Sequence, residues 1–165
     1  MKYRINKIDV AVNQLDWAIK LFFNEAFVPA IALAGGAEEL LGEAALNKTG
    51  SSSFTELTNN LSRQSGLPKN AIGQNYLNMA KNWIKHWQGL KDNESIELEL
   101  ETEAIQYIIR AMSNLVGYCN NRSSESLRFL EWLSENRKGF FCGQSPGLYE
   151  EFKEIDLYTA NSSLK

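Results

Sequence analysis

Apolar residues recur every three or four positions along most of this chain, which is the spacing of amphipathic α-helices. Near the amino terminus, one apolar stripe predicts a helix over about residues 5–24. The stripe consists of Ile8, Val12, Leu15, Ile19, Phe22 and Phe23. The spacing predicts further helices over about residues 28–46, 54–65, 68–89, 104–118 and 123–137. We therefore expect an all-α fold, a bundle of roughly four or five main helices joined by short loops.

Turn and capping signals separate several of these predicted helices. Residues 47–53 (NKTGSSS) form the clearest predicted loop. Ser53, with Glu56 three residues later, matches a capping box at the start of the next helix. Gly66 is expected to end that helix, and Pro68 suits the first turn of the following one.

The second half of the chain departs from the helical pattern at two places. Residues 95–101 (SIELELE) alternate between apolar and acidic side chains, which predicts a short extended segment, and Thr102 is expected to cap the next helix. Glycine and proline make the end of the chain irregular, with a short helix expected over about residues 148–158. We predict a helical bundle domain over residues 1–138 and a carboxy-terminal tail over residues 139–165.

The predicted helix over residues 28–46 is rich in alanine and contains the adjacent pair Gly35 and Gly36. A glycine inside a helix costs about 1 kcal/mol relative to alanine. This cost is tolerated where another part of the chain must come close to the backbone. We therefore expect this helix to be central and tightly packed, with Glu38 and Glu39 directly after the glycines.

Composition limits the classes of function. The 165 residues include 17 Lys and Arg against 20 Asp and Glu, a net charge of −3, which excludes a strongly basic nucleic-acid module but not a local basic patch. Cys119 and Cys142 do not form a CxxC pair, and we expect both to be reduced thiols. The longest apolar run, residues 26–34, is far shorter than the roughly 20 residues of a membrane span. We expect a cytoplasmic protein without a membrane partner.

The segment over residues 81–87 (KNWIKHW) carries the only histidine of the chain, His86. One histidine does not supply a multi-histidine metal site, and the HExxH, paired CxxC, GxGxxG and P-loop patterns are absent. We therefore expect neither a metal nor a cofactor. On a helix, Asn82 and His86 share one face, and Lys81 and Lys85 share an adjacent one.

These groups suit the cleavage of a ribose-phosphate chain, in which the 2′-hydroxyl loses a proton and the leaving oxygen gains one. An imidazole can exchange protons near neutral pH. Amide and ammonium groups can hold a phosphate and offset its charge. A two-fold dimer would supply the second histidine that such a reaction uses.

The same residues resemble the motif of the HEPN family, whose members are helical, usually dimeric proteins with an Arg-x4–6-His motif. In this chain Lys81, Asn82 and His86 are similar to that motif, with four residues between Lys81 and His86. Lys81 stands where the family has arginine, and lysine lacks the planar two-pronged grip of arginine on phosphate. Residues 33–42 (LAGGAEELLG) also resemble a stretch of small bacterial HEPN-like proteins. The resemblance covers about residues 8–118.

The resemblance implies a homodimer that binds RNA or a nucleotide and acts as a metal-independent endoribonuclease, with its site at the dimer interface. His86 would be the general acid and base, and Asn82 would bind or orient phosphate. Lys81 and Lys85 would stabilise negative charge. Many members of the family are toxins of toxin–antitoxin pairs, which makes a cognate antitoxin a further expected partner.

Other interpretations stay open. A lone histidine flanked by Trp83 and Trp87 also fits a packed structural position, and the chain would then be a catalytically inactive helical interaction module. Alternatively it is a toxin–antitoxin component whose partner is unknown. Glu38 and Glu39 are expected to support the site from a neighbouring helix, one of them reaching His86 or Lys85. The simpler expectation is one solvated carboxylate and one that pairs with a basic side chain.

Overall fold

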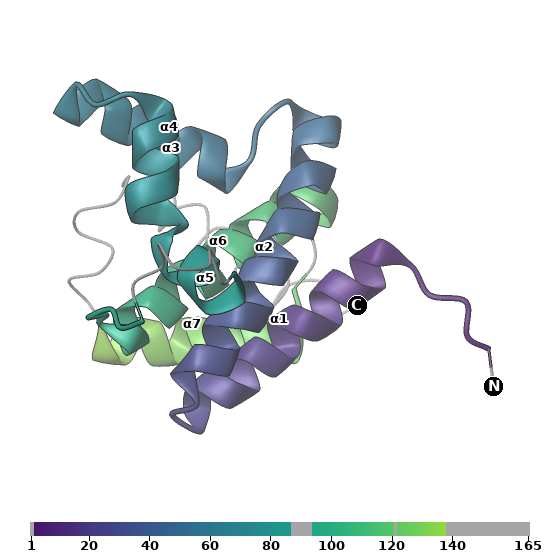
Figure 1. The fold of residues 1–165 in the computed structure, drawn as a ribbon. Helices are drawn as coiled ribbons and strands as arrows, with labels where there is room; N and C mark the ends of the chain where they lie inside the picture. The colour runs from purple at the N-terminus through teal and green to yellow at the C-terminus, as the bar shows by residue number, and fades with distance from the viewer. Residues whose placement is uncertain (1, 87–93, 121, 138–165) are drawn as a thin grey trace. The chain divides into compact units, whose positions relative to one another are not determined.

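The computed structural model describes residues 2–86, 94–120 and 122–137 (Figure 1). Within these ranges every regular element is a helix and no strand occurs, which confirms the all-α class. The longer helices are α1 (Lys7–Phe23), α2 (Phe27–Thr49), α3 (Ser53–Ser65), α6 (Leu100–Cys119) and α7 (Ser124–Asn136). The shorter ones are α4 (Lys69–Ile72), the π-helical turn η1 (Gly73–Leu77) and α5 (Met79–Lys85). None of these described helices is long and apolar enough to cross a bilayer.

The chain separates into two compact units, Met1–Ser126 and Leu127–Lys165. Helices α1 to α6 belong entirely to the first unit. The predicted domain boundary at residue 138, the expected helix over residues 148–158 and Cys142 lie outside the described residues. Cys119, at the end of α6, is a free thiol.

Helix α2 is central to the first unit, as its small residues predicted. It packs against α1, α5 and α6, and Figure 1 shows it beside α1. The contacting faces are apolar and fully buried. They include Leu15 and Ile19 of α1, Ala30, Ile31, Ala34 and Leu41 of α2, and Ile105, Ile108 and Met112 of α6. Alanine at four-residue spacing lets the neighbouring helices approach α2 closely.

The capping residue of α3 differs from the prediction. Ser52, not Ser53, is the N-cap, and its hydroxyl oxygen accepts a hydrogen bond from the Thr55 N–H at 3.3 Å. Ser53 instead bonds to α6: its hydroxyl donates to the Arg110 carbonyl at 3.1 Å, and its N–H donates to Asn114 Oδ1 at 2.8 Å. The predicted capping box is therefore wrong by one residue, because a tertiary contact occupies Ser53.

Two glycines end α2 and α3 in the left-handed conformation that glycine adopts without steric cost. Gly50 has a φ of 80° and Gly66 a φ of 72°. The predicted stop at Gly66 is confirmed. Helix α2, however, continues to Thr49, so residues 47–49 of the predicted loop are helical.

The single helix predicted over residues 68–89 is wrong, because the chain breaks into α4, η1 and α5. The Asn78 N–H donates to the Gly73 carbonyl at 3.0 Å, five residues back, and this bond closes the π-helical turn. Pro68 lies at the N-cap of α4, one position before the predicted one. Helix α5 ends at Lys85, its C-cap His86 has extended backbone angles, and residues 87–89 lie outside the described residues.

The alternating segment over residues 95–101 forms no strand. Helix α6 begins within it at Leu100, with Glu99 as the N-cap, so Thr102 lies in the first turn and the predicted cap there is wrong. Glu101 and Glu103 also lie in that first turn, where acidic side chains favour a helix start. Helix α7 agrees with the predicted helix over residues 123–137 to within one residue at each end.

Candidate functional site

Lys81 lies on α5, but its side chain is buried against α2 and only 3% exposed. The aliphatic part of the side chain passes directly over Gly35. A Cβ atom at Gly35 would lie 2.5 Å from Lys81 Cδ and 2.9 Å from Lys81 Cγ. Carbon atoms pack at about 3.5–4 Å, so only glycine leaves room for the lysine there. This close approach explains the first glycine of the adjacent pair inside α2.

The Lys81 ammonium lies between the two adjacent carboxylates of α2. Its Nζ atom donates a hydrogen bond to Glu39 Oε1 at 2.7 Å and lies 3.7 Å from Glu38 Oε2. The Glu38 side chain is 5% exposed, whereas that of Glu39 is 57% exposed. A buried ammonium needs such compensation, because an isolated charge in the interior is strongly destabilising.

Two residues of helix α6, Arg110 and Tyr107, contact the groups around the Lys81 ammonium. Arg110 Nε lies 3.9 Å from Glu38 Oε1, and Arg110 Nη1 donates to the Leu77 carbonyl of η1 at 3.0 Å. The guanidinium carbon Cζ of Arg110 lies over the Tyr107 ring, 4.3 Å from the ring centroid. The Tyr107 hydroxyl in turn accepts a hydrogen bond from the Lys81 backbone N–H at 3.2 Å. We refer to Glu38, Glu39, Lys81, Lys85 and Arg110 together as the ionic cluster.

Burial sets the protonation of two groups beside the cluster. Desolvation raises the pKa of the Tyr107 hydroxyl, which keeps this hydrogen-bond acceptor neutral at neutral pH. Desolvation also raises the pKa of Glu103, and the Arg110 charge offsets only part of this effect.

The carboxyl group of Glu39, within the cluster, shows the opposite result. Desolvation raises its pKa, but the hydrogen bond from Lys81 and the charges of Lys81 and Lys85 outweigh desolvation and lower the pKa overall. Glu39 is therefore ionised at neutral pH.

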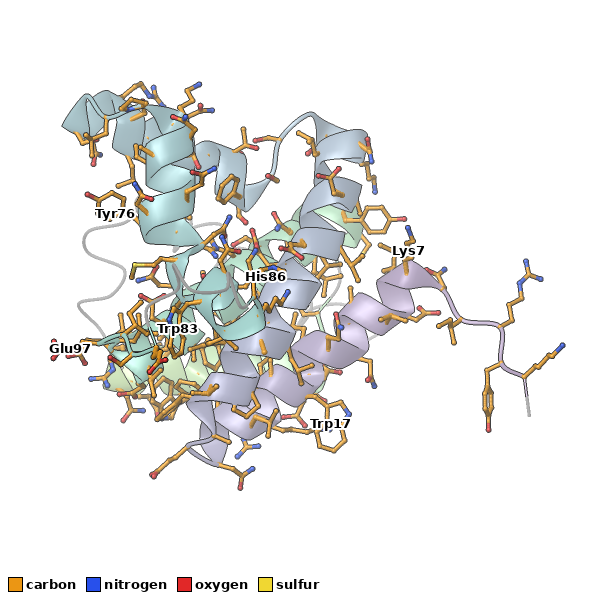
Figure 2. The ribbon with its side chains drawn as sticks, viewed as in Figure 1. Lys7, Trp17, Tyr76, Trp83, His86 and Glu97 are labelled. Carbon is orange, nitrogen blue, oxygen red and sulfur yellow. The ribbon has the colours of Figure 1, made fainter. Side chains whose placement is uncertain are left out.

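The outer edge of the cluster reaches the surface at the last turn of α5. Glu39 Oε2 lies 3.7 Å from the Nζ atom of Lys85, whose side chain is 28% exposed. His86, labelled in Figure 2, follows Lys85 directly and is exposed. Its backbone N–H donates to the Asn82 carbonyl at 3.0 Å, and Asn82 is partly exposed. An ammonium and a tethered carboxylate thus meet at the surface, and the exposed His86 is the next residue along the chain.

The structure places the six residues singled out from the sequence in two environments. Lys81 and Glu38 are buried, and each is paired within the ionic cluster. Lys85, His86, Asn82 and Glu39 retain access to solvent. The expectation that a carboxylate reaches Lys85 is met by Glu39, and both carboxylates pair with basic side chains. Within the described part of the chain, no hydrogen bond or ion pair joins the His86 ring to either carboxylate.

Sequence reasoning did not identify Arg110, Tyr107 or Asn114 of α6. Asn114 Nδ2 donates to the Glu38 carbonyl at 3.2 Å, which fixes the backbone at the carboxylate pair. The available signal was a charged and an amide side chain four residues apart within an otherwise apolar helix face. Such buried polar residues need partners, so they indicate contacts with other elements.

The comparisons with known proteins give no relative for this chain. No protein-family model matches it, and neither does any curated protein or solved structure. Within the described residues, no group of three or more His, Cys, Asp or Glu side chains is placed to hold a metal ion. The chemistry of the site itself is therefore the basis for a function.

Proposed function

We propose that this chain is a HEPN-like cytoplasmic protein that binds RNA at the exposed end of α5 and cleaves it, without a metal, as a homodimer. The observation that supports this proposal most directly is the placement of Lys85 and His86. They are consecutive, both reach solvent, and they lie where α5 ends in extended backbone. An ammonium beside an imidazole can hold a phosphate next to a group that exchanges protons.

In the proposed reaction His86 removes the proton from a ribose 2′-hydroxyl, and the resulting oxygen attacks the adjacent phosphorus. The bond from phosphorus to the 5′-oxygen breaks, and that oxygen takes a proton from the histidine of the second copy. Lys85 offsets the charge on the phosphate, and Asn82 orients it. Lys81 acts indirectly in this scheme, because its buried ammonium positions Glu39 beside Lys85.

The test is incubation of a labelled RNA pool of mixed sequence with the purified protein in the presence of EDTA. We expect cleavage products with 2′,3′-cyclic phosphate and 5′-hydroxyl ends. His86→Ala should reduce the rate by about 100-fold or more, the usual effect of removing a general acid or base. Gln74→Ala is the matched control, since Gln74 is an exposed polar residue of the neighbouring η1. Cleavage that persists in His86→Ala, or that depends on a divalent ion, would contradict the mechanism.

A second candidate function is a catalytically inactive interaction module, and the burial of Lys81 favours it. Lys81 occupies the arginine position of the HEPN-like motif, yet its ammonium faces Glu38 and Glu39 and is 3% exposed. A phosphate cannot contact it without displacing both carboxylates. For this candidate the wild-type protein leaves RNA intact in the same assay. A cognate antitoxin is the protein partner that the family resemblance proposes for either candidate.

A further inference from the structure

Glu39 is tethered on one side and exposed on the other. Its Oε1 atom accepts a hydrogen bond from the buried Lys81 ammonium at 2.7 Å. Its Oε2 atom lies 3.7 Å from Lys85 Nζ at the protein surface. The tether is strong, because the Lys81 ammonium is otherwise compensated only by Glu38 at 3.7 Å among the described residues. The protein therefore holds an anion of its own against the lysine best placed to receive a phosphate.

We propose that Glu39 is a built-in competitor of the RNA phosphate, which must displace the carboxylate from Lys85 before it can bind. This inference rests on the proposed RNA-binding function. A carboxylate and a phosphate are both acceptors for the same ammonium, and two anions within about 4 Å repel each other. Because Glu39 stays anchored to Lys81, the mobile partner is Lys85, whose long side chain can turn from the carboxylate to the phosphate.

The competition reduces the net number of cations that are released when RNA binds. When Lys85 leaves Glu39, the exposed carboxylate takes up a cation from solution while the phosphate releases one. The net release of cations is then smaller than one lysine–phosphate contact normally gives. RNA binding by the wild-type protein should consequently be both weaker and less dependent on salt than the number of lysines at the site indicates.

Glu39→Gln is the informative substitution, because glutamine keeps a carbonyl that can accept the hydrogen bond from Lys81 but removes the charge. The probe is a short fluorescent 2′-O-methyl oligoribonucleotide, which binds like RNA but has no 2′-hydroxyl to react. We expect affinity at low salt to rise about five- to tenfold. The slope of log K against log salt should steepen by roughly 0.7, the value for one additional contact to single-stranded nucleic acid.

Two matched variants separate local competition from a general change in charge. Glu43→Gln alters the net charge equally at an exposed position of α2 one turn later, and it should change affinity much less. Lys85→Gln should weaken binding by itself. In the double variant Glu39→Gln/Lys85→Gln, the gain seen with Glu39→Gln should disappear, because the ammonium that it frees is absent.

Each outcome decides between the proposals. A gain with Glu39→Gln that requires Lys85 supports competition. Wild-type binding that Glu39→Gln leaves unchanged or weakens overturns competition but leaves RNA binding intact. If no variant binds the probe, the proposed function and this inference fail together. Should Glu39→Gln not fold, titration of ¹³C-labelled wild-type protein with the same 2′-O-methyl probe is the second test. The pKa of Glu39 must then rise as Lys85 departs, and no change would reject the competition.

Discussion

The two lysines of α5 make an informative comparison. Lys81 and Lys85 are one helical turn apart, and both face the same carboxylate of α2. Lys81 is 3% exposed and hydrogen-bonds to Glu39 at 2.7 Å, whereas Lys85 is 28% exposed and lies 3.7 Å away. The residue type, the helix and the partner are the same, so the difference between the lysines comes from burial.

Burial determines what each ion pair can do. A buried charge cannot lose its partner without a large loss of stability, because no water replaces the partner. An exposed charge exchanges one anion for another at little cost. Lys81 therefore holds α2 and α5 together, while Lys85 is free to serve a ligand. The predictions below test this division of roles, from the largest expected effect to the smallest.

Lys81→Met should reduce the free energy of unfolding by about 3–5 kcal/mol, because it leaves the Glu38 charge buried with an imperfect partner. Lys85→Met, the same change one turn later, should cost at most about 1 kcal/mol. Urea denaturation followed by circular dichroism measures both values. Equal effects of the two substitutions would remove the distinction between the lysines.

Gly35→Ala should destabilise the protein by about 1–3 kcal/mol, because the new methyl group collides with the Lys81 stem. Gly117→Ala is the matched control within a helix, since a Cβ there meets nothing closer than Ala45 Cβ at 3.9 Å. The control should be neutral or stabilising by up to about 1 kcal/mol. Shortening Lys81 should relieve the collision, so Gly35→Ala and Lys81→Ala should be less harmful together than their sum. Additive effects would show that the collision does not matter.

Glu39→Gln should have a small effect on stability, and the effect should depend on pH. The pKa of Glu39 is lowered in the folded protein, so its contribution is present above the ordinary value of 4.5 and is lost as pH falls below it. Because the carboxylate is more than half exposed, we expect a loss of at most about 1 kcal/mol at pH 7, and the loss should shrink as pH falls below 4.5.

Glu103→Gln provides the opposite case. Burial raises the pKa of Glu103, so its ionised form disfavours folding at neutral pH. The substitution should increase stability at pH 7, and the gain should fade below pH 4.5, where the folded and unfolded proteins both carry the protonated acid. Urea denaturation across this pH range measures both variants. The same sign of effect at pH 7 for Glu39→Gln and Glu103→Gln would contradict the opposite pKa shifts of the two carboxyl groups.

The sequence was most informative where a structure depends on residues close together in the chain. Helical spacing predicted α1, α2, α3, α6 and α7, and Gly66 predicted where α3 ends. It was least informative where distant segments compete for the same groups. The Ser53 hydroxyl bonds to α6 instead of capping α3, and a π-helical turn interrupts a stretch whose apolar spacing favours one helix.

The candidate site divides in the same way. The positions of Asn82 and Lys85 on one short helix follow from their spacing, because helical geometry alone brings residues three or four apart together. His86 follows them at the C-cap in extended backbone, which the spacing did not predict. The sequence also indicated Gly35, because a glycine inside a helix is costly, and with it Glu38 and Glu39, which follow shortly after the glycine pair. The tertiary structure alone decided that Lys81 crosses Gly35 and that Arg110 of α6 faces Glu38. Burial and long-range ion pairing depend on how helices pack, and no local pattern specifies which of two similar lysines will be enclosed.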